Sequence, residues 1–424
     1  MNGAPQLARR LGTFDAVVIG LGSMIGAGVF SAFGPAAAAA GASLLIGLAL
    51  AAGVAYCNAV ASAQLAAQYP TSGGTYVYGR ERLGEWWGFL AGWGFVIGKT
   101  ASCAAMALTF ASYAAPGAGF GRRAIAATAV AVLTGANLRG ITRTAALARV
   151  LVSAAIVALL VVVAAILATG NVSQHGFAGL GGLHHGGVHG VLQAAALLFF
   201  AFAGYARIAT LGEEVREPAR TIPRAIPIAL AIVVVLYVVV GATALAAAGP
   251  ATLAAATTPL AAAAKVAGAA WAQPVVRIGA AVASLGALLA LIAGIGRTTL
   301  AMARNGDLPH WLASVESERS VPDHAELLLG LVVIALVLTT DLRGAIGFSS
   351  FGVLIYYAVA NVAAFTQPPA QRRWPRALNV IGAAACMLLV ASLPEHAIVA
   401  GVLVLAIGLG GRAIVLASKR RRLA

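Results

Sequence analysis

Four glycines interrupt one apolar stretch near the start of the chain. They lie within residues 13–30 and are Gly20, Gly22, Gly26 and Gly28. Each glycine inside a helix costs roughly 1 kcal/mol of helix propensity relative to Ala, so the pattern predicts a broken helix. The break frees backbone N–H groups where little water is available, and such groups bind anions. Residues 20–28 are therefore a candidate binding site.

Ionisable side chains also occur inside apolar stretches. Lys99 lies near the middle of residues 85–112. An ammonium at the centre of a bilayer costs at least ~2.5–3.5 kcal/mol, which makes such a residue a functional candidate. The alternative is a lysine that snorkels or bonds carbonyls between helices. Arg207 and Arg297 lie nearer the ends of their stretches. Because Arg does not deprotonate, both suit pairs with carboxylates. For Arg207 the candidate partners of a gate are Asp15, Glu213 and Glu214, and interfacial anchoring is the alternative.

The composition fixes the class of protein. Of 424 residues, 61% are hydrophobic and only 10% are charged, which is too little polar surface for a soluble protein of this length. We therefore expect a multi-pass membrane protein with the lipid bilayer as its surroundings. The net charge of +15 suggests nucleic acid only in a soluble protein, and no nucleic-acid partner is expected here.

The hydropathy pattern predicts twelve membrane spans of about 20 residues each. Their ranges are 14–37, 43–67, 85–112, 122–136, 147–169, 190–213, 225–248, 272–300, 325–340, 345–366, 378–393 and 396–416. Cys57, Cys103 and Cys386 fall inside spans, are odd in number and predict no disulfide framework.

The basic residues predict an orientation. With a cytoplasmic N-terminus, most arginines and the tail 419–422 lie on the cytoplasmic side. The basic residues left on the other side are Arg122, Arg123, Lys265, Arg277 and Arg343. We expect a protein of the cell membrane, either the inner or the plasma membrane, with both termini cytoplasmic and a retained first span rather than a cleaved signal peptide.

A second interrupted span gives the domain plan. Gly204 lies inside the sixth span, five spans after the first break. This spacing is expected of an inverted repeat of five helices with the site where the two breaks face each other. The plan is one transporter domain over 1–424, with a first repeat at 14–169, a second at 190–366 and two additional helices at 378–416.

Five motifs in order resemble one known family. They are GSMIGAGVF at 22–30, PTSGGTY at 70–76, NLRG at 137–140, FFAFAGY at 199–205 with the loop 213–226, and AMARNGDLP at 301–309. They are similar to motifs of permeases in the amino acid–polyamine–organocation (APC) superfamily. Glycine clusters alone usually mark close helix packing, but five motifs over roughly 14–322 are specific.

The resemblance implies an all-α LeuT-type fold, alternating access, and transport of amino acids or related amines. In such a site the N–H groups of Ser23 to Gly28 hold the carboxylate and the carbonyls of Phe200 to Ala203 hold the ammonium. The expected substrate-binding residues are Ser23, Met24, Ile25, Gly26, Ala27, Gly28, Phe200, Ala201, Phe202, Ala203 and Gly204.

The same resemblance suggests how transport is gated and coupled. Phe200 occupies the position of the family's gating aromatic; Phe202 is also a packing candidate, and Tyr205 suits either role. Proton-coupled relatives often carry a lysine on the fifth helix, a position that falls near Ala155, but the fifth span has no lysine. We expect Lys99 to supply that cation, with the proton as coupling ion or with exchange. Sodium is less favoured because the eighth span offers Ser284 without an adjacent hydroxyl.

Other functions fit the sequence less well. An enzyme needs buried catalytic groups, whereas the acidic residues lie almost entirely at span ends or in loops, and we expect no cofactor or metal. A channel or an amino acid sensor is a remaining alternative. Ala- and Gly-rich walls favour a small or aliphatic neutral amino acid, with a cationic amino acid or polyamine as the alternative. His175, His184, His185 and His189 predict a solvated loop, and metal binding or pH sensing there is the alternative.

Overall fold

The computed structural model describes residues 11–71, 73–119, 121–140, 145–172, 174–177, 179–181, 186–316 and 321–423. Within these ranges the protein is all-α, and extended pairing is limited to isolated bridges such as that between Leu11 and Val215. The predicted fold class is confirmed in this respect. His184 and His185, named in the sequence argument, lie outside the described residues.

The first five predicted spans each fall on a helix or on consecutive helical segments. The segments are α1 (Thr13–Met24), α2 (Ala27–Ser31), α3 (Phe33–Ala40), α4 (Leu44–Gln68), α6 (Glu85–Ala114), α7 (Gly121–Leu138) and α8 (Ala145–Ala168). The helix α5 (Thr75–Leu83) connects α4 to α6. Ala32 keeps helical dihedral angles, so α2 continues into α3.

The remaining predicted spans also fall on helices. They are α9 (Gly187–Phe202) with α10 (Ala206–Ala209), α11 (Pro218–Ala255), α13 (Gln273–Arg304), α14 (Asp323–Thr339), α15 (Leu342–Phe365), α16 (Arg376–Ala391) and α17 (Glu395–Leu423). A short helix, α12 (Pro259–Val266), precedes α13. By length and apolar composition, eight helical stretches among the described residues suffice to cross a membrane, and α9 and α16 are shorter. The count of twelve spans stays a prediction.

The helix α11 differs from its predicted range of 225–248. It begins at Pro218, inside a segment read from sequence as a charged loop. A proline is well tolerated in the first helical turn, because an N–H at that position has no hydrogen-bond partner within the helix and its absence costs nothing there. At the other end, Gly249 leaves helical geometry (φ 71°, ψ 165°) ahead of Pro250. The straight part of α11 therefore ends where the span was predicted to end.

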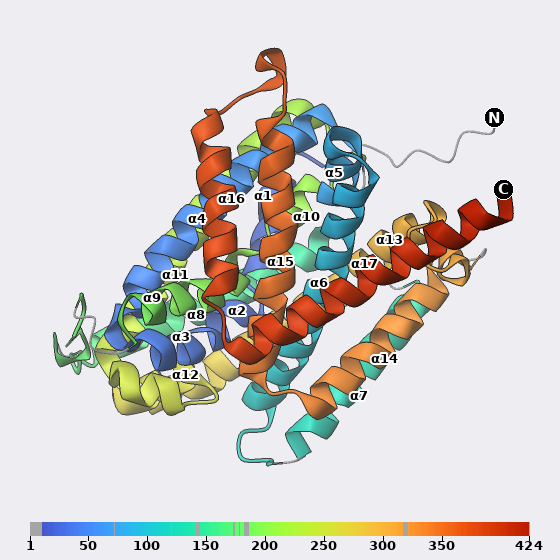
Figure 1. Ribbon diagram of the computed structural model, residues 1–424. Helices are drawn as coiled ribbons and strands as arrows, with labels where there is room; N and C mark the ends of the chain where they lie inside the picture. The colour runs from blue at the N-terminus through green and yellow to red at the C-terminus, as the bar shows by residue number, and fades with distance from the viewer. Residues whose placement is uncertain are drawn as a thin grey trace.

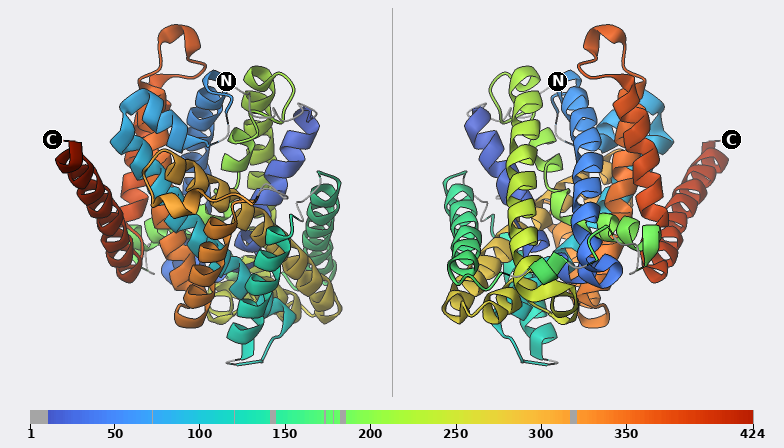
Figure 2. Two further views of the ribbon diagram at one scale, coloured as in Figure 1. Left: turned by 90° about the vertical axis from the view of Figure 1, so that its right-hand side faces the viewer. Right: turned by 90° about the vertical axis from the view of Figure 1, so that its left-hand side faces the viewer.

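The helices pack into one bundle whose interior is rich in alanine and glycine. α15 packs along α6 and α4, and α13 packs along α6 and α8. Figure 1 shows α7 and α14 side by side at one edge, while α17 crosses the other helices obliquely. Both views of Figure 2 place α17, in red, on the outside of the bundle. Small side chains allow the close helix contacts that stabilise a membrane bundle.

A buried arginine attaches α17 to the bundle. Arg412 Nε donates to Asp307 Oδ1 at 2.8 Å, and both side chains are 3% exposed. Arg80 and Tyr76 of α5 donate to the other carboxylate oxygen, Oδ2, at 3.1 and 2.8 Å. The guanidinium of Arg412 also lies 4.4 Å from the ring centroid of Trp86. The loop after α13, α5, the start of α6 and α17 therefore meet in one polar cluster.

Candidate substrate-binding site

The first span breaks at Ile25 and Gly26, as its glycines predict. Ile25 has φ −79° and ψ 63°, and Gly26 has φ −108° and ψ −140°, so neither is helical. The Gly26 N–H donates to the carbonyl of Met24 at 2.8 Å. The N–H groups at the start of α2 have no carbonyl within the helix to receive them. These groups, at the positive end of the α2–α3 segment, are available to a carboxylate.

The sixth span breaks between Phe202, where α9 ends, and Ala206, where α10 begins. The last carbonyls of α9 lack helical partners for the same geometric reason. Gly204 lies in this gap and contacts the backbone of the first break. A Cβ at Gly204 would overlap the carbonyl group of Ser23 and lie 2.5 Å from Met24 N. Glycine is thus required for the two breaks to touch.

A cavity of about 140 Å³ lies beside both breaks. The predicted residues that line it are Ser23, Met24, Gly26, Gly28, Lys99, Phe200, Ala203, Gly204 and Arg207. Arg297, the other arginine considered from sequence, also lines it. Further residues in its wall that the sequence did not single out include Phe95, Ser102, Met106, Ala287 and Thr298. The structure therefore brings the two broken helices and Lys99 to one space.

Six predicted residues do not line this cavity: Ile25, Ala27, Ala201, Phe202, Tyr205 and Ser284. Tyr205 is fully buried and stacks on Tyr357, with ring centroids 5.0 Å apart. Phe202 packs against the ring of Tyr237 at 5.1 Å. Ser284 is buried, and its hydroxyl has no hydrogen-bond partner among the described residues. Side-chain packing explains why Tyr205 and Phe202 are turned away from the space.

Lys99 reaches the break of the sixth span. Its Nζ donates to the carbonyl of Ala203 at 3.0 Å, and its side chain is buried. The hydroxyl of Tyr357 donates to the same carbonyl at 3.3 Å, so both lone pairs of that oxygen are used. No carboxylate forms an ion pair with Lys99 in the described part of the chain. The lysine thus forms a hydrogen bond to one of the carbonyl groups that the sequence predicted to bind a substrate ammonium.

Tyr237 of α11 joins the two breaks and was not predicted. Its hydroxyl lies 2.7 Å from the carbonyl oxygen of Met24 and 3.1 Å from that of Ala201, and it donates to one at a time. The side chain is buried. The available sequence signal was a tyrosine in the middle of an apolar span, where a buried hydroxyl needs a partner.

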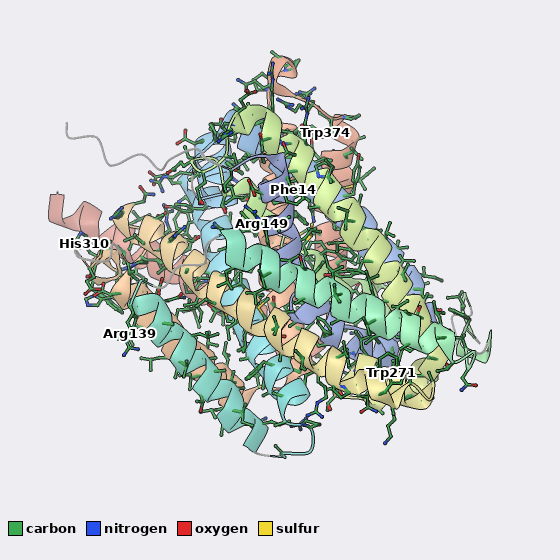
Figure 3. All side chains as sticks on the ribbon, turned by 180° about the vertical axis from the view of Figure 1, so that it is seen from behind. Phe14, Arg139, Arg149, Trp271, His310 and Trp374 are labelled. Atoms are coloured by element: carbon green, nitrogen blue, oxygen red, sulfur yellow. The ribbon has the colours of Figure 1, made fainter. Side chains whose placement is uncertain are left out.

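The arginines predicted as gates or anchors lie at one side of the cavity. Arg207 Nη2 is 3.9 Å from Glu214 Oε1, one of the pairs expected from sequence. Of the other two candidate partners, Asp15 instead accepts from Arg149 Nη2 at 3.0 Å. Figure 3 shows the labelled Arg149 close to Phe14 at the start of α1, and Trp271 and His310 near opposite ends of α13. Arg297 lies near the end of α13 that precedes His310, and Arg207 interacts electrostatically with Arg297.

Comparison with known proteins places the chain in a family. The sequence profile of a family described as amino acid permease matches residues 11–408. The chain belongs to the amino acid permease family. An uncharacterized transporter of Mycobacterium tuberculosis is 56% identical to the permease over 403 residues, which is 95% of this chain and 90% of that protein.

Two relatives of the permease carry substrate classes in their names. The branched-chain amino acid permease BcaP of Bacillus subtilis is 28% identical over 402 residues, covering 90% of this chain and 85% of BcaP. The vacuolar cationic amino acid transporter 4 of Arabidopsis thaliana is 28% identical over 389 residues, covering 85% of this chain and 63% of that protein. The family expected from the five motifs is confirmed. The permease is a multi-pass membrane protein and an amino acid transporter.

Proposed function

We propose that this permease moves α-amino acids by alternating access and binds them in the cavity between the two helix breaks. The observation that supports this most is the pairing of unlike backbone groups beside one space, with N–H groups at the start of α2 and carbonyls at the end of α9. An α-amino acid presents a carboxylate and an ammonium that match these two sets. The inverted repeat of 14–169 and 190–366 belongs to this proposal.

A second cavity supports alternating access. It has a volume of about 380 Å³, lies at the end of α2, and is lined by residues that include Ser31, Ser112 and Ala255. The substrate cavity extends instead toward Ala301 near the end of α13. With the orientation predicted from basic residues, the substrate cavity faces the cytoplasm and the second cavity faces outward, as in an inward-facing state of a cell-membrane transporter.

The wall of the substrate cavity bears on the side chain that is carried. Met106, Ala287 and Leu291 make part of the wall apolar, which accommodates the small or aliphatic neutral amino acids favoured from sequence. No carboxylate lines the cavity among the described residues, so a cationic side chain finds no ion-pair partner there. This weighs against the cationic alternative.

Lys99 is the proposed coupling group. Its Nζ and a substrate ammonium compete for the carbonyl of Ala203, and two positive charges in one buried site repel each other. Substrate binding therefore favours the neutral amine, and by reciprocity loss of the proton favours binding. The apparent affinity for substrate should rise with pH.

Uptake by purified protein in proteoliposomes tests both parts. Amino acids and common amines are first screened by counterflow, and saturable uptake of an amino acid is expected; its absence would contradict transport. Lys99→Met should bind substrate with an affinity that no longer varies with pH, because a neutral side chain replaces the titrating one. Lys99→Arg should bind weakly at every pH. A pH profile in Lys99→Met equal to that of the wild type would exclude Lys99 as the coupling group.

A further inference from the structure

The substrate cavity presents cations and no anions among its described lining residues. Lys99, Arg207 and Arg297 all contribute to its wall. The α-carboxylate of a neutral amino acid is already matched by the N–H groups at the start of α2. Recognition of a neutral amino acid therefore needs neither arginine.

The carboxylates near these arginines lie outside the cavity wall. Arg207 is 3.9 Å from Glu214, and its Nη1 donates to Thr210 Oγ1 at 3.0 Å. Arg297 interacts electrostatically with Glu326 of α14, which is buried. Neither glutamate lines the cavity. The positive groups therefore face the space, and the negative groups lie behind them.

Arg297 has capacity for another partner. Its side chain is exposed, and in the described part of the chain no hydrogen bond or ion pair to it is formed. A guanidinium binds a carboxylate through two parallel N–H donors, which makes it selective for that planar group.

The second cavity, on the other side of the breaks, is also lined by more basic than acidic side chains. Arg122, Arg123 and Arg343 line it together with one acid, Asp341. The carboxylate of Asp341 accepts from the N–H of Gly344 at 2.7 Å and caps α15. Three of the basic residues assigned to that face from sequence thus gather in one cavity. A passage lined by positive charge on both sides attracts an anion.

We propose that the preferred cargo is an α-amino acid whose side chain carries a carboxylate, recognised by Arg207 and Arg297. Neutral amino acids are then weaker substrates of the same site. This inference rests on the proposed amino acid transport and names its substrate class.

The test compares uptake of L-aspartate, L-glutamate, L-leucine and L-arginine by the full-length protein in proteoliposomes. The kcat/KM for an acidic amino acid should exceed that for leucine by at least about tenfold, the effect of one charge-assisted hydrogen bond. Higher kcat/KM for leucine or arginine than for both acidic amino acids overturns the inference and leaves amino acid transport standing. Uptake of no amino acid would overturn both.

Variants separate recognition from folding. Arg297→Gln and Arg207→Gln should each lower kcat/KM for the acidic substrate by about 10- to 100-fold, and by more than they lower kcat/KM for leucine. Arg297→Lys should restore part of the loss because it restores the charge. Arg304→Gln is the matched control, since Arg304 ends the same helix, is exposed and does not line the cavity. Equal losses for acidic substrate and leucine in both Gln variants would refute a role in side-chain recognition.

Discussion

Replacing Gly204 by alanine should separate the two helix breaks. A Cβ at this position would overlap the Ser23 carbonyl, and its neighbours there are backbone atoms that no side-chain rotation can move. Carbon atoms in ordinary contact lie about 3.5–4.0 Å apart, so the breaks must shift by about 1 Å. The gain of up to ~1 kcal/mol that alanine brings to a helix does not apply, because Gly204 lies outside α9 and α10.

The expected loss follows from that overlap. Forcing a methyl group into a packed interior costs typically ~1–3 kcal/mol, which corresponds to a change of about 5- to 150-fold in binding. Gly204→Ala should therefore lower both the Tm of the detergent-purified protein and the kcat/KM for uptake in proteoliposomes. Because the shift moves the N–H groups of one break away from the carbonyls of the other, uptake should suffer even where the protein folds.

Two other glycines serve as controls for this prediction. A Cβ at Gly26 would lie 3.0 Å from the Cβ of Ala287 and 3.4 Å from the terminal methyl group of Met106. These contacts are longer than those at Gly204 and the methionine can move aside, so Gly26→Ala should have a smaller effect on Tm. Gly53, within α4, has no atom within 4 Å of such a Cβ. Gly53→Ala should keep full uptake with an unchanged or higher Tm. Wild-type Tm and uptake in Gly204→Ala would refute the close contact of the breaks.

The polar cluster around Asp307 gives two further predictions. Asp307→Asn leaves the buried Arg412 without its main ion-pair partner and should lower the free energy of unfolding by about 3–5 kcal/mol, seen as a large drop in Tm. Arg220→Gln, in an exposed pair with Glu217, should lower it by at most about 1 kcal/mol. Similar Tm values for the two variants would contradict this prediction. Burial, with the hydrogen bond to Asp307, raises the pKa of Tyr76 from 10.0 to about 12. As the pH rises, the phenol loses its proton first in the unfolded protein, so the free energy of unfolding should fall between pH 10 and 12. Denaturant unfolding over this pH range should show a shallower fall for Tyr76→Phe than for the wild type. Equal slopes of unfolding free energy against pH in the two proteins would exclude this contribution.

Local signals in the sequence predicted much of the fold. Hydropathy placed the helices to within a few residues, because an apolar stretch of span length forms a helix wherever it enters the membrane. Gly26 and Gly204 marked both breaks for a related reason. A glycine in the middle of a span weakens the helix at that position and admits close contact. The early start of α11 was missed because prolines in the first turn resemble a loop.

Contacts between distant segments could not be predicted in the same way. The bond from Lys99 to Ala203 joins residues 104 positions apart, and nothing near Lys99 indicates which carbonyl it reaches. Tyr237 lies 213 positions from Met24. The burial of Tyr205 against Tyr357 likewise depends on how α15 packs beside the sixth span. Pairings of this kind depend on the arrangement of whole helices rather than on any motif.

The position of Lys99 changes what a cation in this site would do. The fifth-helix position that holds a lysine in proton-coupled relatives falls near Ala155, which is fully buried in α8 and cannot supply a charge. Lys99 instead donates to the carbonyl of Ala203 after the end of α9, which is where the proposed site receives a substrate ammonium. A cation at that end competes with the substrate ammonium rather than supporting the carboxylate. Proton loss from Lys99 should therefore promote binding, so substrate and proton would be expected to occupy the site in turn.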